Sequence, residues 1–315
     1  MSDFNHQELI IAIAQCFYYS RNSISEIAKQ FKISRYYVEK YLDEATNEGL
    51  VNIQINAPIS RQRTMERLFK QIFPNEKIII VKDAPNPTNT TANVFLYAAQ
   101  EIQHSLTPNE VIGLSWGETI YDLIQHFNTA DYPNILFTQI MGENMKYNSK
   151  AGSMRLVEMA ANRLGAKYQT MVAPLYVFND QARELWTKEP AIKPTLALGS
   201  SLNLIICSLG NLESLETVST WKQEIDRIIP PSARKKVAGL LYGRPFDLNG
   251  NFINEKDIPV FSMPIKQILK TPKKITVVTN KLKAEATLGA MRGQLLNTFY
   301  LSESVASKIL ILLKH

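Results

Sequence analysis

Basic and aromatic side chains gather between residues 29 and 40, where they could contact nucleic acid. The candidates are Lys29, Lys32, Ser34, Arg35, Tyr36, Tyr37 and Lys40. Arginine pairs with base edges in the major groove of DNA, whereas contacts to phosphates position a protein without reading sequence. We therefore expect the arginine and one of the two tyrosines to contact bases, and the three lysines to contact phosphates.

These side chains need a helix to present them, and residues 23–42 have the pattern of two short helices joined by a tight bend. Ser23 and Glu26 are spaced as a capping box, and Ser34 is suited to cap a second helix. Apolar residues at helical spacing follow each cap. The pattern is typical of a helix-turn-helix, whose second helix enters the major groove, and the alternative is an ordinary helical hairpin.

The flanking segments predict a complete small domain. At the bend stands Lys32, where a left-handed conformation would cost a residue other than glycine on the order of 1 kcal/mol. Residues 7–19 have the apolar spacing of an amphipathic helix, and Gly49 follows the second helix as a glycine past a C-cap does. Apolar and polar residues alternate over 51–56, as in a strand. We expect residues 1–57 to form a winged helix-turn-helix DNA-binding domain.

A second set of candidate residues stands at turns that follow predicted strands. They are Ser115, Gly117, Glu118, Thr119, Gly142, Glu143, Asn144, Gly210, Asn280 and Lys283. In open α/β sheets the ligand lies past the carboxyl ends of the strands, and main-chain amides at the start of a helix attract anions. A lysine at a helix N-terminus opposes the helix dipole, so Lys283 indicates an anionic ligand. We expect a site for a phosphorylated or polyhydroxylated small molecule.

From residue 77 onward, apolar strand-like runs alternate with helical segments. The predicted strands are 78–81, 111–115, 135–140, 204–208, 275–278 and 297–301, and the predicted helices are 89–105, 119–127, 150–164, 215–228, 281–292 and 303–313. Strands that are apolar throughout and connected by helices predict a doubly wound, mainly parallel α/β sheet with both faces covered.

This α/β domain is expected to span residues 58–315, with a linker helix over 58–74. The apolar residues of the segment 61–73 recur at helical spacing. Two interpretations of this helix stay open, because it could pack on its own domain or pair two protomers.

Composition narrows the class of protein. The chain has 315 residues, 45% hydrophobic residues and a net charge of +6, which suit a soluble protein of about two domains. Residues 1–56 hold five basic and seven acidic side chains, so DNA binding rests on the motif rather than on bulk charge. Two cysteines, four scattered histidines and no long apolar run favour a cytoplasmic protein without a disulfide framework, metal site, cofactor or membrane span.

Several segments resemble one known family when taken in order after the helix-turn-helix. They are VIGLSWGETI, MVAPLYV, LIICSLG, GLLYGRPFDLNGN and TNKLKAEATLGAMRGQLLN. The resemblance is to the SorC family of bacterial sugar-responsive transcription regulators and covers roughly residues 8 to 312. It implies a DNA-binding domain joined to an effector domain shaped like sugar-phosphate isomerases, in homodimers or homotetramers. In such proteins a phosphorylated sugar changes binding to double-stranded operator DNA.

The resemblance also assigns roles to residues. It makes the turn from Ser115 to Thr119 the phosphate cradle and Lys283 a ligand contact, and it adds Asp247 as a site residue. Leu240 stands where the family usually has an aspartate, so a carboxylate that would bind sugar hydroxyls is missing. Glu143 likewise replaces the second glycine of a glycine pair.

Three hypotheses about function follow. The leading one is a regulator of carbohydrate-utilisation genes that responds to a phosphorylated sugar. The second is an enzyme of the isomerase or deaminase type, which the sequence disfavours because no histidine joins Glu118, Glu143 and Asp247 near the strand ends, and Met141 offers no amine for a Schiff base. The third is a regulator that has lost its small-molecule response.

Overall fold

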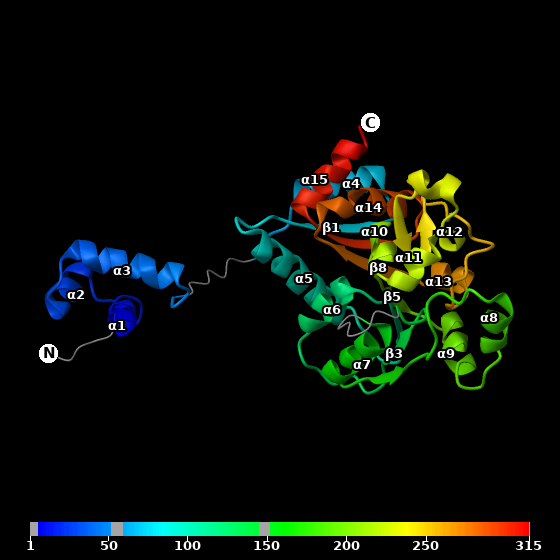
Figure 1. Ribbon diagram of the computed structural model, residues 1–315, viewed down its shortest axis with the longest axis horizontal. Coiled ribbons are helices and arrows are strands. Elements are labelled where there is room, and N and C mark those ends of the chain that lie inside the picture. The colour runs from blue at the N-terminus through cyan, green and yellow to red at the C-terminus, as the bar shows by residue number, and fades with distance from the viewer. Residues whose placement is uncertain (1–5, 52–58, 145–151, 315) are drawn as a thin grey trace. The chain divides into compact units, whose positions relative to one another are not determined.

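The computed structural model describes residues 6–51, 59–144 and 152–314. The chain divides into two compact units, Met1–Pro58 and Ile59–His315, and each is considered by itself (Figure 1).

The first unit is built from three helices around a small apolar core. The helices are α1 (His6–Tyr18), α2 (Ile24–Phe31) and α3 (Arg35–Asn47). Each contributes fully buried aliphatic side chains, among them Ile13 of α1, Ile27 of α2 and Val38 of α3. Because these residues recur at helical spacing, one face of every helix is buried and the opposite face stays exposed.

Local signals set the ends of α2 and α3. The Ser23 side chain accepts a bond from the Glu26 amide, and the Glu26 carboxylate accepts one from the Ser23 amide at 2.8 Å, which completes the capping box. Ser34 caps α3 through the Tyr37 amide. Between the helices Lys32 has φ 57° and ψ 39°, the left-handed conformation expected at the bend of a helix-turn-helix. Of the predicted wing, only the first residue, Val51, lies within the described residues; it packs on this core.

The second unit contains a seven-stranded sheet in which all six strand pairs are parallel. The strand order is β1-β9-β8-β5-β2-β3-β4, where the strands are β1 (Lys77–Val81), β2 (Val111–Leu114), β3 (Leu136–Gln139), β4 (Lys167–Gln169), β5 (Leu204–Ile206), β8 (Lys273–Val278) and β9 (Thr298–Ser302). The predicted α/β class and parallel sheet are confirmed. The edge strand β4 was not predicted, because it has only three residues and none is fully buried.

Helices cover both faces of this sheet (Figure 1). On one face lie α5 (Pro87–His104), α6 (Glu118–Gln125) and α7 (Ser153–Arg163), and on the other lie α4 (Arg63–Ile72), α13 (Ile265–Lys270), α14 (Ala284–Arg292) and α15 (Glu303–Leu312). Strand β1 shows why its sequence is apolar throughout: Ile79 packs toward the first group of helices, whereas Ile78 and Ile80 pack toward the second.

Short elements fill the segments between these layers. They are α8 (Asp180–Trp186), α9 (Lys193–Ala197), η1 (Leu198–Ser200), α10 (Glu213–Glu216), α11 (Ser219–Gln223), α12 (Ile225–Ile228), η2 (Pro231–Lys236), η3 (Lys281–Lys283) and the hairpin strands β6 (Gly239–Leu241) and β7 (Arg244–Phe246). The single helix predicted over 215–228 is wrong. Val218 is extended, at φ −108° and ψ 113°, and it separates two of the three short helices there. The break lets both Val218 and Trp221 reach the core.

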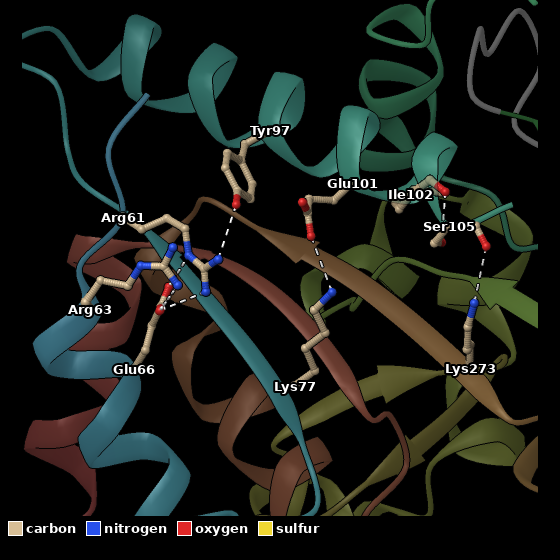
Figure 2. A network of polar contacts seen from close by, with 9 residues as sticks. All are labelled: Arg61, Arg63, Glu66, Lys77, Tyr97, Glu101, Ile102, Ser105 and Lys273. Carbon is tan, nitrogen blue, oxygen red and sulfur yellow. Dashed lines mark hydrogen bonds and ion pairs between the residues drawn. The ribbon is translucent and has the colours of Figure 1, made fainter. Parts of the chain in front are cut away.

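The segment that enters the second unit is fixed by polar contacts (Figure 2). Arg61 donates two 2.8 Å bonds to the Glu66 carboxylate and one of 3.2 Å to the Tyr97 hydroxyl of α5. The Glu66 carboxylate also accepts the Ile80 amide of β1. A bidentate arginine–carboxylate pair fixes orientation as well as distance, so the start of α4 is held against the sheet edge.

Helix α4 has one buried and one exposed apolar side. Phe69 is fully buried against its own unit, whereas Leu68 and Ile72 are 45% and 46% exposed. Packing on its own domain is therefore observed, and a role in pairing protomers stays a prediction. In the described part of the chain, no helix is both long and apolar enough to cross a bilayer.

Candidate functional site

A cavity of about 300 Å3 opens at the carboxyl ends of β2 and β5. Strands β3 and β4 extend the sheet on one side of β2, whereas β5, which comes next in the chain, pairs with the other side of β2. The carboxyl ends of these two neighbouring strands thus mark the point where the strand order reverses, which is where ligands bind in open α/β sheets. Of the predicted site residues, the cavity is lined by Ser115, Gly117, Glu118, Thr119, Asn144, Gly210 and Lys283.

The turn after β2 offers an anion its main-chain amides. The amides of Gly117, Glu118 and Thr119 meet no acceptor among the described residues, and they belong to the N-cap and the first turn of α6. Gly117 has φ 129° and ψ 159°, a conformation that essentially only glycine adopts, and an added Cβ would lie 2.7 Å from the Ser208 hydroxyl. Free amides at the positive end of a helix form an anion site.

Lys283 supplies a positive charge at the same cavity. It ends η3, directly before α14, and Asn280 caps η3 by accepting the Leu282 amide at 2.9 Å. Burial lowers the pKa of Lys283, and the Glu118 carboxylate opposes that shift. No hydrogen bond joins its ammonium group to another described residue. A half-buried lysine without a bonded partner beside free amides is arranged to neutralise a bound anion.

The β6–β7 hairpin brings an apolar wall to the cavity. Tyr242 and Gly243 form its two-residue turn with φ 56° and 72°, and Leu240 exchanges two main-chain hydrogen bonds of 2.9 Å with Gly210. Leu240 therefore stands beside the end of β5. The other aliphatic residues that line the cavity are Met141, Leu175, Leu209, Leu215, Val218 and Leu241.

Most hydroxyl groups on the cavity wall already donate to the protein. Those of Ser115 and Ser208 donate to the Trp116 carbonyl at 3.3 and 2.9 Å, which fixes the turn. The other donors and their acceptors are Ser214 to Asn211, Thr217 to Ser214, Tyr176 to Gly243 and Tyr242 to Leu295. Each of these hydroxyls thus helps to shape the cavity before a ligand arrives.

Aromatic rings form one side of the site. Trp116 contacts Trp221 at 5.7 Å between ring centroids, and Trp221 contacts Tyr176 edge-on at 5.1 Å. The indole nitrogen of Trp116 is buried and meets no hydrogen-bond acceptor among the described residues. Burial raises the pKa of Tyr176 well above its usual value, so this hydroxyl stays a neutral donor.

Four predicted site residues do not line the cavity. Gly142 lies against Pro174, where an added Cβ would be 2.4 Å from the carbonyl oxygen, and Asn280 caps η3. Glu143 accepts the Asn144 and Met154 amides at 3.0 Å.

The carboxylate of the fourth such residue, Asp247, shapes a turn. It accepts the amides of Asn249 and Asn251, both at 2.9 Å. Burial acts to raise the pKa of Asp247, but these hydrogen bonds hold it below its usual value. The sequence placed all four near a strand end or in a family motif, and their side-chain contacts could not be read from it.

The cavity also contains residues that were not among the predicted site residues. Ser208 and Leu209 lie just past the end of β5, so the rule that ligands lie past strand ends could have found them. Tyr176 and Leu215 come from a loop and a short helix, and no local signal marks them. Leu240 was linked to the site by the family resemblance alone.

The surface of the first unit is a candidate DNA interface. The predicted contact residues Lys29, Lys32, Ser34, Arg35, Tyr36, Tyr37 and Lys40 are all exposed. Tyr36 and Tyr37 are 68% and 46% exposed, while Val38 beside them is fully buried. The first turn of α3 carries no acidic residue. Such a helix end is open to enter a groove and to approach phosphates.

Within residues 6–51, 59–144 and 152–314, no three histidine, cysteine, aspartate or glutamate residues cluster to hold a metal ion. The two cysteines are free: Cys16 is half-buried and Cys207 is buried.

A helix-turn-helix unit in one chain with an α/β unit that carries an anion-suited cavity defines the class of ligand-responsive DNA-binding proteins. The family model "Putative sugar-binding domain" matches residues 57–311. The chain belongs to that family and, with it, to the SorC-type regulators.

Relatives resemble this chain over nearly its whole length. It is 21% identical over 312 residues to the deoxyribonucleoside regulator of Bacillus subtilis, with 96% of this chain and 97% of the relative covered. It is 23% identical to the sorbitol operon regulator of Klebsiella pneumoniae, with 98% and 100% covered. The crystal structure of full-length SorC from Klebsiella pneumoniae matches with a TM-score of 0.68 at 21% identity, covering 96% of this chain and 98% of that one. A transcriptional regulator from Streptococcus pneumoniae matches with a TM-score of 0.71 at 16% identity, covering 80% and 98%.

Proposed function

We propose that this protein is a DNA-binding regulator of carbohydrate-utilisation genes, and that a phosphorylated sugar bound in the second unit modulates its binding to operator DNA. The observation that carries the proposal is the turn after β2, where three free amides at the start of α6 share a cavity with Lys283. This arrangement suits a phosphate group better than a neutral ligand.

The chemistry of the cavity supports binding over catalysis. Proton transfer on a sugar phosphate needs a base within reach of the carbon skeleton. Among the described residues that line the cavity, Glu118 is the single carboxylate, and none is a histidine or cysteine. Relatives of the chain are named as transcriptional regulators, which agrees with a protein that acts without turnover.

DNA recognition is proposed to use α3 of two protomers. One short recognition helix reads few base pairs, so a homodimer or homotetramer on a palindromic site supplies the missing specificity. The protein would act in the cytoplasm, where its operator is.

The experiment is a gel-shift titration with DNA from upstream of the protein's own gene, with and without a panel of sugar phosphates. The proposal expects binding that prefers this DNA over a scrambled duplex of equal length, and an affinity that changes when one class of phosphate ester is added. Equal binding to both duplexes under every condition would contradict it.

A further inference from the structure

We infer that the ligand of the cavity between β2 and β5 is a phosphate ester whose body is apolar or poor in hydroxyl groups, rather than the phosphate ester of a polyol. The inference rests on the proposed function, because it places the phosphate at the turn after β2. It narrows the ligand from phosphorylated sugars in general to those that carry few hydroxyl groups.

The first observation is the nature of the wall beside the anion turn. Leu240 is held next to Gly210 by two main-chain hydrogen bonds, which fix its backbone at the cavity that its side chain lines. Leu209 and Leu215, which are both buried, also line the cavity. A body placed beyond the phosphate on this side therefore meets aliphatic carbon, while the Glu118 carboxylate and the Asn144 side chain line the cavity elsewhere.

The second observation is that the wall has few hydrogen-bond donors left to offer. Six hydroxyl groups, those of Ser115, Tyr176, Ser208, Ser214, Thr217 and Tyr242, already donate to protein oxygens. A polyol oxygen placed against these six groups would lose water and meet no free donor there, and a buried polar group that is left unpaired weakens binding. A hydroxyl-poor body loses little on entry and gains apolar contact.

The third observation is the position of the Trp116 ring at the cavity. The buried indole N–H of Trp116 meets no acceptor among the described residues, although its ring lies at the cavity. The nitrogen itself is buried, so the ring meets the cavity through its carbon atoms, and the face of an aromatic or aliphatic body would lie among the rings of Trp116 and Tyr176. The cavity thus suits a phosphate joined to a largely apolar body.

The test ranks matched phosphate esters by isothermal titration calorimetry on the full chain. The probes are phenyl phosphate and butyl phosphate, which lack hydroxyls, against ribose 5-phosphate and glucose 6-phosphate, with inorganic phosphate as the reference. We expect the two hydroxyl-free esters to bind at least about 10-fold tighter than the two sugar phosphates. Equal or tighter binding of the sugar phosphates by the wild-type chain would overturn the inference.

Two variants of Leu240 sharpen the test. Leu240→Asn keeps a similar side-chain size but offers a donor and an acceptor, so we expect the preference for phenyl phosphate to fall about 10-fold or reverse. Leu240→Met keeps the wall apolar and should leave the ranking unchanged. Circular dichroism shows whether each variant is folded, and the wild-type ranking decides the question even if Leu240→Asn does not fold.

Lys283→Met separates this inference from the proposed function. If that variant loses affinity for every probe while the wild type prefers sugar phosphates, the anion site stands and the hydroxyl-poor body is wrong. If the variant binds every probe as the wild type does, the anion site itself is wrong. Failure of the wild type to bind any probe would overturn both.

Discussion

The two candidate binding surfaces of this protein use their polar side chains in opposite ways. On α3 and the turn before it, the predicted contact groups are exposed, and α3 begins without an acidic residue. Around the cavity, six hydroxyl groups already donate to protein oxygens, and the amides of the turn after β2 and Lys283 remain for the ligand. A groove-reading surface keeps its side chains free for its partner, whereas a pocket fixes its shape beforehand and leaves few groups to choose the ligand.

The units that carry these surfaces also differ in the size of their cores. Among the residues that the structure describes, eight hydrophobic ones are buried in the first unit, while the second unit holds three separate buried clusters on and around its sheet. A domain of about 60 residues buries a smaller share of its surface and is only marginally stable. We therefore expect the first unit to be the more easily unfolded of the two.

The largest effect is expected from breaking the core of the first unit alone. Ile13→Ala truncates a fully buried side chain of α1 and should lower the free energy of unfolding by about 2–5 kcal/mol, enough to abolish DNA binding. Ile11→Ala, on the same helix but 39% exposed, is the matched control and should have little effect on stability. In differential scanning calorimetry, the first unit of Ile13→Ala should unfold at a lower temperature than the second unit. The second unit should still bind the phosphate ester. Loss of ligand binding in Ile13→Ala would show that the second unit does not stay folded when the first unit unfolds.

The next effect concerns the anion site. Lys283→Met removes the charge at the cavity and should weaken a phosphate ester by about 1.5–3 kcal/mol, the range for hydrogen bonds to charged groups. Lys281→Met, at the exposed start of η3, removes an equal charge from the same short segment and should change affinity little. Titration calorimetry on both variants is the measurement. Equal losses in the two would mean that general charge, rather than the cavity, attracts the ligand.

DNA reading should divide between base and phosphate contacts. Arg35→Ala should lower the preference for the operator over a scrambled duplex by about 1–3 kcal/mol, because a base contact is lost. Lys40→Ala should weaken both duplexes alike and reduce the slope of log affinity against log salt by about one. Anisotropy titrations at several salt concentrations separate the two results. An intact preference in Arg35→Ala would place the reading residues elsewhere.

The smallest effect tests the bend of the helix-turn-helix. Lys32 and Gly49 both have positive φ, at 57° and 73°, and an added Cβ at Gly49 meets no atom within 4 Å. Because a left-handed conformation is unfavourable for a residue other than glycine, Lys32→Gly should stabilise the first unit by about 1 kcal/mol. For the same reason, Gly49→Ala should destabilise it by a similar amount. Thermal unfolding gives both values. Because Lys32 is also a predicted phosphate contact, Lys32→Gly should bind DNA more weakly despite its greater stability.

The helices of the first unit and the sheet of the second could both be predicted from local sequence. Caps, apolar spacing and the left-handed bend are local, so Ser23, Lys32 and Ser34 could be assigned from neighbouring residues alone. The parallel sheet was predictable for the same reason, because each buried strand is a run of apolar residues.

The cavity was predictable only in part. The turn after β2 and Lys283 follow from the rule that ligands lie past strand ends. Leu240 reaches the site through a hairpin bridge to Gly210, a contact between segments far apart in the sequence. Asp247 was expected at the site from resemblance, but its carboxylate shapes a turn. Long-range pairing of this kind leaves no periodic signal.

The central claim is that a ligand in the second unit changes DNA binding by the first. The most direct measurement is the affinity of the full chain for its upstream DNA, with and without a saturating phosphate ester, for the wild type and Lys283→Met. The account predicts that the ligand shifts the wild-type affinity and leaves that of Lys283→Met unchanged, while both bind DNA equally without ligand. A ligand effect of the same size in Lys283→Met, or none in the wild type with any phosphate ester that binds it, would contradict the claim.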